Sequence, residues 1–287
     1  MRGWRRVGAG VACCWALAGC SGIARPKDGP QTAPEVLAVH RARKLPTTLQ
    51  GEARMEAYAE GKARKADLLL RLQRPGQAQL QVMTPTGDMI AVLATDGARF
   101  TSFERGGAVC LQGPACGANM ARLVPLALPP SQLVDAVLGA PPLLEDPAPS
   151  LDWDEERGAF ALVLRQGNQR QELWLQPPRM DPLASIVYQD GKRIASIAYG
   201  EYGKAGVPGL AAQIRVRMTR GEADVSIALR DVEADGEIEP EAFAVPCPSG
   251  MPSQELPCEP ADAGLPEPKP LPTPTPTPGD AAAPEGP

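Results

Sequence analysis

The sequence predicts a mainly β domain, in which an antiparallel sheet built from hairpins is covered by a few short helices. Apolar and polar residues alternate with a period of two along much of the chain, which is typical of strands with one face in water. Short runs rich in Gly, Pro and Asp separate these segments and predict tight turns. With 287 residues, 43% of them hydrophobic but only 4% aromatic, the chain can bury a sizeable and mainly aliphatic core.

The N-terminus has the pattern of a secretion signal. A basic start precedes an apolar run from Val7 to Ala18, which is shorter than the roughly 20 residues that span a bilayer as a helix. We expect residues 1–19 to be a signal peptide, with a short retained membrane anchor as the alternative. The run ends in Leu17-Ala18-Gly19-Cys20, which resembles the lipobox of bacterial lipoproteins and implies cleavage after Gly19 and acylation of Cys20 by diacylglycerol and a further acyl chain. By the enterobacterial sorting rule, Ser21 implies an outer-membrane lipoprotein that faces the periplasm.

Four cysteines remain beyond the predicted lipid anchor: Cys110, Cys116, Cys247 and Cys258. An even number in an oxidising compartment favours disulfides. The short spacings favour two local bridges, Cys110 to Cys116 and Cys247 to Cys258, although three connectivities are open. A zinc site is the rival interpretation. Zinc sites typically use cysteine pairs separated by about two to four residues, which are absent among these four cysteines, so no metal is expected.

The first elements follow a tether over residues 20–34. Thr32 and Glu35 form a capping box, which predicts a helix that continues to about Lys44 and is ended by Pro46. Period-two alternation then predicts strands over 48–57, 66–73, 77–82 and 98–104. The segment Met89–Thr95 is apolar on both faces, so we expect another segment to cover its second side. Tight turns between these strands make an antiparallel meander.

Helical patterns follow at 118–124 and 130–138, where Gly139 and two prolines end the second helix. Strands resume near 160–164 and 173–175, and hairpins are predicted for 184–200 and 211–232. Because every strand pair is a hairpin, no parallel pairing is expected. The domain is expected to span 35–246. Residues 247–287 are predicted to be a disulfide-stapled and then Pro-rich tail, either solvated or a spacer towards a partner that the sequence does not identify.

The sequence contains no catalytic constellation. The single histidine, His40, lies among basic residues on the first predicted helix and is expected to be solvated. The acidic cluster at Asp152, Asp154, Glu155 and Glu156 lacks the spacing of a calcium loop and predicts a charged surface turn. The net charge of −5 and the absence of a basic patch exclude a typical nucleic-acid binder. We therefore expect neither an enzyme nor a cofactor.

Several segments together resemble a known family. They are LQGEARMEAY, PGQAQLQVMTPTGDMIAVLATDGARFTSF, LVPLALPPSQLVDAVLGAPP and VSIALRDVEADGEIEPEAFAVPCPSG. They are similar to the periplasmic lipoprotein carriers and receptors LolA and LolB and their lipid-anchored relatives of unassigned function. The resemblance implies a half-open antiparallel β-barrel, closed by short α-helices, whose apolar interior receives acyl chains, and a docking turn from Glu239 to Phe243.

Two functions remain open at this stage. In the first, the protein is a lipoprotein acceptor or lipid carrier that holds acyl chains in its barrel. In the second, it is a lipid-anchored structural or assembly partner with a filled barrel. The two functions differ in the surroundings of one set of apolar side chains. In the filled barrel other parts of the protein cover them, and in the carrier they line a cavity. These residues are Leu68, Leu70, Leu72, Leu80 and Val82. The few aromatic residues favour the cavity, because large rings fill a barrel most readily.

Overall fold

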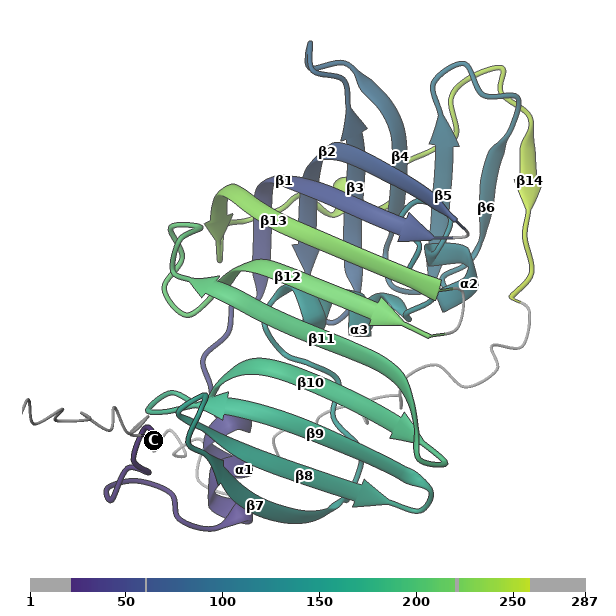
Figure 1. The fold of residues 1–287 in the computed structure, drawn as a ribbon. Helices are drawn as coiled ribbons and strands as arrows, with labels where there is room; N and C mark the ends of the chain where they lie inside the picture. The colour runs from purple at the N-terminus through teal and green to yellow at the C-terminus, as the bar shows by residue number, and fades with distance from the viewer. Residues whose placement is uncertain (1–21, 60, 220–221, 259–287) are drawn as a thin grey trace, which may run out of the picture.

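The computed structural model describes residues 22–59, 61–219 and 222–258. Its main feature is one sheet of fourteen strands, which curls around its own apolar face (Figure 1). The strands are β1 (Thr48–Ala59), β2 (Lys62–Gln73), β3 (Gln77–Met83), β4 (Met89–Thr95), β5 (Arg99–Glu104), β6 (Cys110–Pro114), β7 (Ala148–Asp154), β8 (Ala159–Gln166), β9 (Gln169–Gln176), β10 (Asp181–Gln189), β11 (Lys192–Tyr202), β12 (Ala211–Met218), β13 (Ala223–Ala234) and β14 (Ser253–Glu255). The helices are α1 (Ala33–Arg41), α2 (Gly117–Met120), α3 (Pro130–Val137) and the 3-10 turn η2 (Pro240–Phe243). This confirms a mainly β fold.

The strand order is β14-β6-β5-β4-β3-β2-β1-β13-β12-β11-β10-β9-β8-β7. Two meanders, β1 to β6 and β7 to β13, are joined where β1 pairs antiparallel with β13. The expectation that every pair is a hairpin is wrong at two places. The β1–β13 pair joins strands far apart in sequence, and β14 pairs parallel with β6. The sheet is not a closed barrel, because its first and last strands, β14 and β7, are not neighbours.

One glycine helps the sheet to curl. The register between β1 and β13 shifts between Gln50 and Glu52, where Asp231 and Val232 of β13 stand opposite Gly51, which marks a bulge in β13. A Cβ atom at Gly51 would lie 2.5 Å from the carbonyl oxygen of Asp231, so no larger residue fits there without a backbone shift. The bulge bends β13 beside Gly51, at the point where the two meanders meet.

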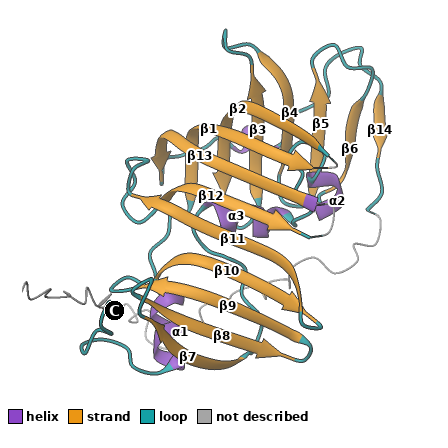
Figure 2. Ribbon diagram, viewed as in Figure 1, coloured by secondary structure: helices purple, strands orange, loops and turns teal. Residues whose placement is uncertain are grey.

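The curled sheet encloses two hydrophobic cores, which define two lobes (Figure 2). The large lobe comprises β1–β6 and β11–β14, together with α2 and α3, and it surrounds the larger core. The small lobe comprises β7–β10 and α1, and its core is formed by ten buried residues: Ala33, Val36, Leu37, Leu144, Phe160, Leu162, Leu164, Leu173, Leu175 and Met180. In Figure 2 the small lobe lies below the large one, with α1 behind its strands.

Helix α1 begins as the sequence predicted. The Glu35 carboxylate accepts hydrogen bonds from the backbone N–H groups of Gln31 and Thr32, and Pro34 occupies the first turn. These hydrogen bonds lower the pKa of Glu35 below its usual value. Val36 and Leu37 then pack into the small-lobe core. Helix α1 therefore covers one face of β7 and β8 and does not contact the other face.

The chain that follows β13 forms a strap over the opposite face of the large lobe. We define the C-terminal strap as residues 235–258. Its turn η2 contacts β3 and β4, and the Phe243 ring is buried. Both Val92 and Leu93 of β4 are buried although they point to opposite faces of the sheet. The strap thus supplies the second cover that was expected for Met89–Thr95.

Part of the predicted tail belongs to the fold. Residues 253–255 form β14, which pairs with residues 110–112 of β6. The segment 247–258 therefore packs against the sheet, whereas a disulfide-stapled segment outside the domain was expected after position 246. The Pro-rich residues from 259 onwards lie outside the described residues, as does the predicted signal peptide. None of the described helices combines the length and the hydropathy that a bilayer-spanning helix needs.

Candidate functional site: the apolar inner face of the large lobe

The five predicted cavity residues share one face of the large lobe. Backbone register places Leu68 opposite Val82 and Leu70 opposite Leu80, while Leu72 faces Ala78. Side chains directly opposite one another in an antiparallel pair lie on the same face, so the alternation in β2 and β3 produces one continuous apolar surface. The same face continues through β1, β13 and β12 with Leu49, Met55, Ile227, Val225, Ile214 and Val216.

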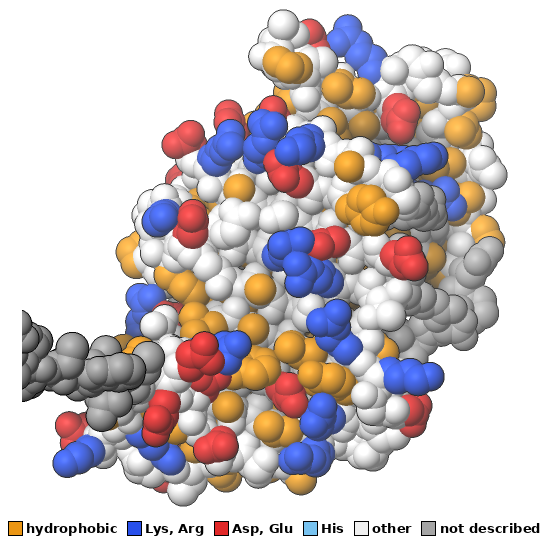
Figure 3. Space-filling view, viewed as in Figure 1, with side chains coloured by type: hydrophobic (Ala, Val, Ile, Leu, Met, Phe, Trp, Pro, Cys, Tyr) orange, Lys and Arg blue, Asp and Glu red, His pale blue; other side chains and the backbone are white. Residues whose placement is uncertain are grey.

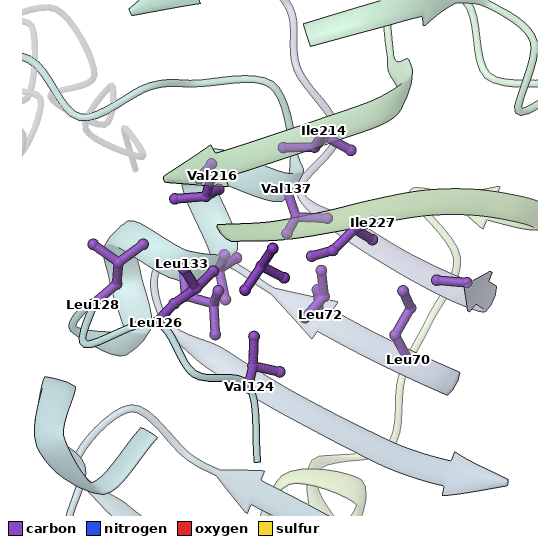
Figure 4. Close-up of a cluster of buried hydrophobic side chains, with 14 of the residues drawn as sticks. Leu70, Leu72, Val124, Leu126, Leu128, Leu133, Val137, Ile214, Val216 and Ile227 are labelled. Atoms are coloured by element: carbon purple, nitrogen blue, oxygen red, sulfur yellow. The ribbon is translucent and has the colours of Figure 1, made fainter. Parts of the chain in front are cut away.

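A segment between β6 and β7 covers this surface. Residues 117–138 contain α2, a stretch of turns and α3, and their apolar side chains belong to the same core cluster. Figure 4 shows side chains of this segment directed towards those of β2, β12 and β13. The labelled residues of the segment are Val124, Leu126, Leu128, Leu133 and Val137. The sequence predicted α3 correctly, but the helix predicted over 118–124 is wrong beyond Met120, and the covering role of residues 125–129 was missed, although the alternation Val124, Leu126, Leu128 was a usable signal.

Burial decreases along β2 towards the β1–β2 hairpin. Leu68, Leu70 and Leu72 are at most 3% exposed, and Leu80 is 6% exposed. Val82 and Ala66 are half-buried, and Arg64, which lies on the same face, is exposed. Since the apolar face meets solvent at this end, any route from solvent to the leucines is shortest there.

One buried polar atom lies at the edge of this apolar interior, near Tyr202, Arg43 and Asp135. Tyr199, on β11 opposite Ile214, is 6% exposed and belongs to the large-lobe core. Its hydroxyl is buried and makes no hydrogen bond within the described residues. Burial raises the pKa of this phenol well above its ordinary value, so the group remains a neutral donor. A buried hydroxyl without a partner costs about 1–3 kcal/mol, so it is a group that a ligand acceptor could satisfy.

Two surface hollows lie elsewhere. One, of about 500 Å³, lies among the α1–β1 connection, the β11–β12 loop and the end of β13. The other, of about 400 Å³, lies on β7–β9 of the small lobe. Neither is lined by any of the five predicted cavity residues. Both are open to solvent and mix charged with apolar side chains, whereas the inner face of the large lobe is almost entirely apolar.

A buried ionic network lies where the two lobes meet. The Arg43 guanidinium donates to the carbonyl oxygens of His40 and Gly139, at 3.2 and 2.5 Å, and lies 3.4 Å from Asp181. Arg179 binds the other oxygen of the same carboxylate at 2.6 Å. Arg43 therefore connects α1, the end of the covering segment and the start of β10. Pairing from both sides satisfies a charge that would otherwise be costly to bury.

The expectation of a solvated His40 is wrong. The side chain is 4% exposed, and its Nδ1 lies 2.9 Å from the carbonyl oxygen of Met180, so Nδ1 carries the proton and donates. Burial, assisted by the nearby Arg43 cation, lowers the pKa of His40 to about 4. The basic neighbours in the sequence suggested a solvent-exposed face of the helix, but α1 places His40 against β10 of the small lobe.

The four cysteines form two disulfides, but the local pairing expected from their spacing is wrong. Cys110 pairs with Cys247 and Cys116 pairs with Cys258, with Cα atoms 5.8 and 6.1 Å apart. The physical reason is that Cys110 begins β6, beside which the strap returns, whereas Cys116 precedes α2. Both bonds attach the strap to the large lobe. Within the described residues no cluster of three or more His, Cys, Asp or Glu is placed to hold a metal ion.

The acidic cluster is a surface turn, as predicted. Glu155 and Glu156 lie in the β7–β8 turn, where Asp154 binds Arg157 at 2.5 Å and accepts a hydrogen bond from the Trp174 indole at 3.0 Å. Hydrogen bonds from Arg157 lower the pKa of Asp154. Asp152 is exposed on β7. The predicted lipidation residue Cys20 lies outside the described residues.

Comparison with known proteins gives similarities of fold. No family model matches the chain, and no curated protein sequence does. Among solved structures, a LolA superfamily protein from Nitrosomonas europaea has a TM-score of 0.49 at 10% identity, and the match covers 75% of this chain and 98% of that one. A DUF1329 family protein from Desulfovibrio piger has a TM-score of 0.47 at 14% identity, covering 74% and 93%. An outer membrane lipoprotein-sorting protein domain from Vibrio parahaemolyticus has a TM-score of 0.42 at 12% identity, covering 74% and 94%.

The similarity to these solved structures is limited, with TM-scores from 0.42 to 0.49. The matches span nearly the whole length of the other chains but leave about a quarter of this chain unmatched. At 10 to 14% identity they say nothing about which molecules this chain binds.

Proposed function

We propose that this protein is a lipid-anchored periplasmic lipoprotein of the outer membrane that binds acyl chains on the inner face of its large lobe, as a lipoprotein acceptor or lipid carrier. The observation that carries the proposal is the continuous apolar face of β1–β3 and β11–β13, covered by a segment with little regular structure. A sheet face of this extent is usually covered by long helices or by a second sheet. Here residues 121–129 provide much of the cover, and turns are more readily displaced than packed helices.

The proposed ligand is apolar with at least one hydrogen-bond acceptor. Acyl chains would replace the side chains of residues 117–138 over the leucines as the covering segment moves outward. The Tyr199 hydroxyl, unpaired in the described residues, would then donate to an ester or amide carbonyl at the head of the chain. Arg64 and the half-buried Val82 mark the end where the chain would enter.

The anchor is proposed from Cys20, whose lipobox would give two or more acyl chains and hence stable attachment. We propose no enzymatic activity, because no nucleophile is seen beside a base in the described part of the chain and its one histidine is committed to Met180. The Pro-rich residues after 258 are proposed as a spacer outside the binding domain.

The decisive experiment is native mass spectrometry of the Cys20→Ala protein, purified from the periplasm without detergent. We expect co-purified lipid or lipopeptide, or uptake of an added diacylated lipopeptide. Leu70→Trp should abolish this uptake, because the indole would occupy the space of the chain. Leu162→Trp, in the small-lobe core, is the matched control and should bind acyl ligand if it folds.

The alternative is a filled large lobe that serves as a lipid-anchored assembly partner. Its supporting observation is that four of the five leucine and valine side chains are already at most 6% exposed. A clean apo mass, with no uptake of added lipopeptide, would establish this alternative and contradict the carrier. Cys20→Ala should in either case release the protein from the membrane fraction. Quantitative retention of that variant with membranes would contradict the anchor.

A further inference from the structure

The first described residues are attached to the small lobe. The backbone N–H of Ile23 donates to the carbonyl oxygen of Glu155 at 2.8 Å, and the Trp153 indole N–H donates to the carbonyl oxygen of Ile23 at 2.7 Å. The Arg25 guanidinium lies 5.3 Å from the centre of the Phe160 ring and donates to the carbonyl oxygen of Gln31 at 2.7 Å. The sequence predicted a free tether here, whereas residues 22–31 form a segment docked on β7 and β8. We call it the N-terminal brace.

The sequence of the β7–β8 turn accommodates the brace. Gly158 has a φ of +61°, and a Cβ atom there would lie 2.9 Å from the Ile23 side chain. A Cβ atom at Gly22 would lie 2.7 Å from a Glu155 carboxylate oxygen. Two glycines on opposite sides of the contact thus allow the backbones to approach. Ile23 is therefore held through both its backbone polar groups, while its side chain lies against Gly158 and remains 56% exposed.

We infer that the brace holds the β7–β8 turn of the small lobe against the bilayer and directs the large lobe away from it. The inference rests on the proposed acylation of Cys20. Ile23 lies three positions after Cys20, and three extended Cα–Cα steps span at most about 11 Å. A tether that was free up to Thr32 would span roughly 40 Å and would allow the domain to take any orientation.

The orientation follows from the fold. In Figure 1 the brace lies at the lower left, beside the small lobe, and the β3–β4 connection lies at the top of the large lobe. With the anchor within about 11 Å of Ile23, the membrane partner is the lipid interface below the small lobe. The acidic turn at Glu155 and Glu156 would not be drawn to anionic lipid, so the covalent anchor and the brace must supply the orientation. The exposed end of the large-lobe inner face would then open towards the periplasm.

Energy transfer on the acylated protein tests this orientation. The four described cysteines are paired, so Glu156→Cys or Thr86→Cys provides a single labelling thiol in each of the two turns. The labelled proteins are reconstituted in vesicles of phosphatidylethanolamine and phosphatidylglycerol that carry an acceptor dye on a lipid head group. We expect transfer from position 156 to be several-fold higher than from position 86. Equal transfer from both positions would overturn the inference.

A matched pair of glycine variants tests the brace itself. Gly158→Val should push Ile23 off the turn and reduce the difference between the two positions. Gly167→Val places the same residue at a similar φ of +57° with no atom within 4 Å of its Cβ, and it should leave the difference unchanged. Trp153→Phe, which removes only the indole donor to Ile23, provides a second test if Gly158→Val does not fold. An undiminished difference in a folded Gly158→Val or Trp153→Phe protein would overturn the role of the brace.

A soluble readout separates this inference from the proposed anchor. In the Cys20→Ala protein the amide of Ile23 should be protected from hydrogen exchange, and Trp153→Phe should abolish this protection. If the wild-type protein does not associate with membranes, both the anchor and the orientation fail. If it associates but residues 22–31 exchange as fast as an unstructured chain, only the brace fails.

Discussion

The sheet of the large lobe is covered on its inner face and, at β3 and β4, on its outer face as well, whereas the outer face of the small lobe is only half-buried. Residues 117–138 cover the inner face of the large lobe, and the C-terminal strap covers its outer face at β3 and β4. In the small lobe α1 covers one face, and the side chains on the other include Val163, Trp174, Ala184 and Ile186. Figure 3 shows hydrophobic side chains gathered over this part of the surface. The same period-two pattern therefore has different outcomes, according to whether a distant segment returns to cover it.

The two lobes also differ in how their covers are held. Two disulfides attach the strap to the large lobe. The small lobe contains no cysteine, and its cover depends on α1, the Arg43 network and the buried amide of Gln171. On the outer face of the small lobe, Arg157 lies over the Trp174 ring at 5.5 Å and Arg170 over the Tyr188 ring at 4.2 Å. Arginines thus shield the two rings that no other segment covers.

The largest expected effect on stability follows from removing the disulfides of the large lobe. Replacing all four cysteines of these bonds by Ser should lower the free energy of unfolding by about 5 kcal/mol or more, because the two bonds close loops of 137 and 142 residues. Urea denaturation measures the loss. Hydrogen exchange should show faster opening of the strap and β6, with β8 and β9 least affected. Equal acceleration in both lobes would contradict the separation of the two cores, and non-reducing peptide mapping checks the pairing itself.

A smaller, pH-dependent effect is expected at the junction. Burial lowers the pKa of His40 from 6.5 to about 4, so the folded state favours the neutral ring. This contribution is complete above the unfolded pKa and is lost as the pH falls from about 6.5 through 4. Its full size is about 3 kcal/mol. Unfolding measured from pH 7 to pH 4 should show this loss in the wild type, and His40→Gln should remove it. An identical pH profile in both proteins would contradict the burial of His40.

The buried amide of the small lobe should contribute less. Gln171 donates to the Pro142 carbonyl oxygen at 2.6 Å and to the Ser185 hydroxyl at 2.9 Å, and its Oε1 accepts from the Leu144 N–H at 3.0 Å. Gln171→Leu should lower the free energy of unfolding by about 1–3 kcal/mol, because these partners remain buried without it. Gln166→Leu, at an exposed position of β8, is the control and should change stability by less than about 0.5 kcal/mol.

The smallest expected change in stability distinguishes the packing of the two lobes most directly. If the large lobe can open for a ligand, Leu70→Trp should cost less than about 1 kcal/mol, because the covering segment can shift. Leu162→Trp in the small-lobe core should cost about 1–3 kcal/mol through overpacking. Thermal unfolding of the two apo proteins gives the comparison. Equal losses would indicate that both cores are filled to the same density and would favour the assembly-partner function.

The local features of the fold could be predicted from the sequence. The alternation in β2 and β3 places Leu68, Leu70 and Leu72 on one face, and the capping box starts α1, because both depend on neighbours in the chain. The burial of His40 could not be predicted, since its partner Met180 is 140 residues away. The disulfides join residues 137 and 142 apart, so spacing alone misled their assignment. The docked brace was missed for the same reason, because Ile23 contacts a turn that the sequence places far downstream.

Strand β14 covers an edge of the sheet that would otherwise be free to pair with another chain. Without it, β6 would be the outermost strand, with free N–H and C=O groups that invite another chain to add to the sheet. The strap places three exposed polar residues, Ser253 to Glu255, on that side, and Pro252 and Pro257 flank them. At the opposite boundary, β7 carries Pro149, which has no N–H to offer, and the charged Asp152. A sheet of fourteen strands thus ends on both sides in residues that discourage self-association and aggregation.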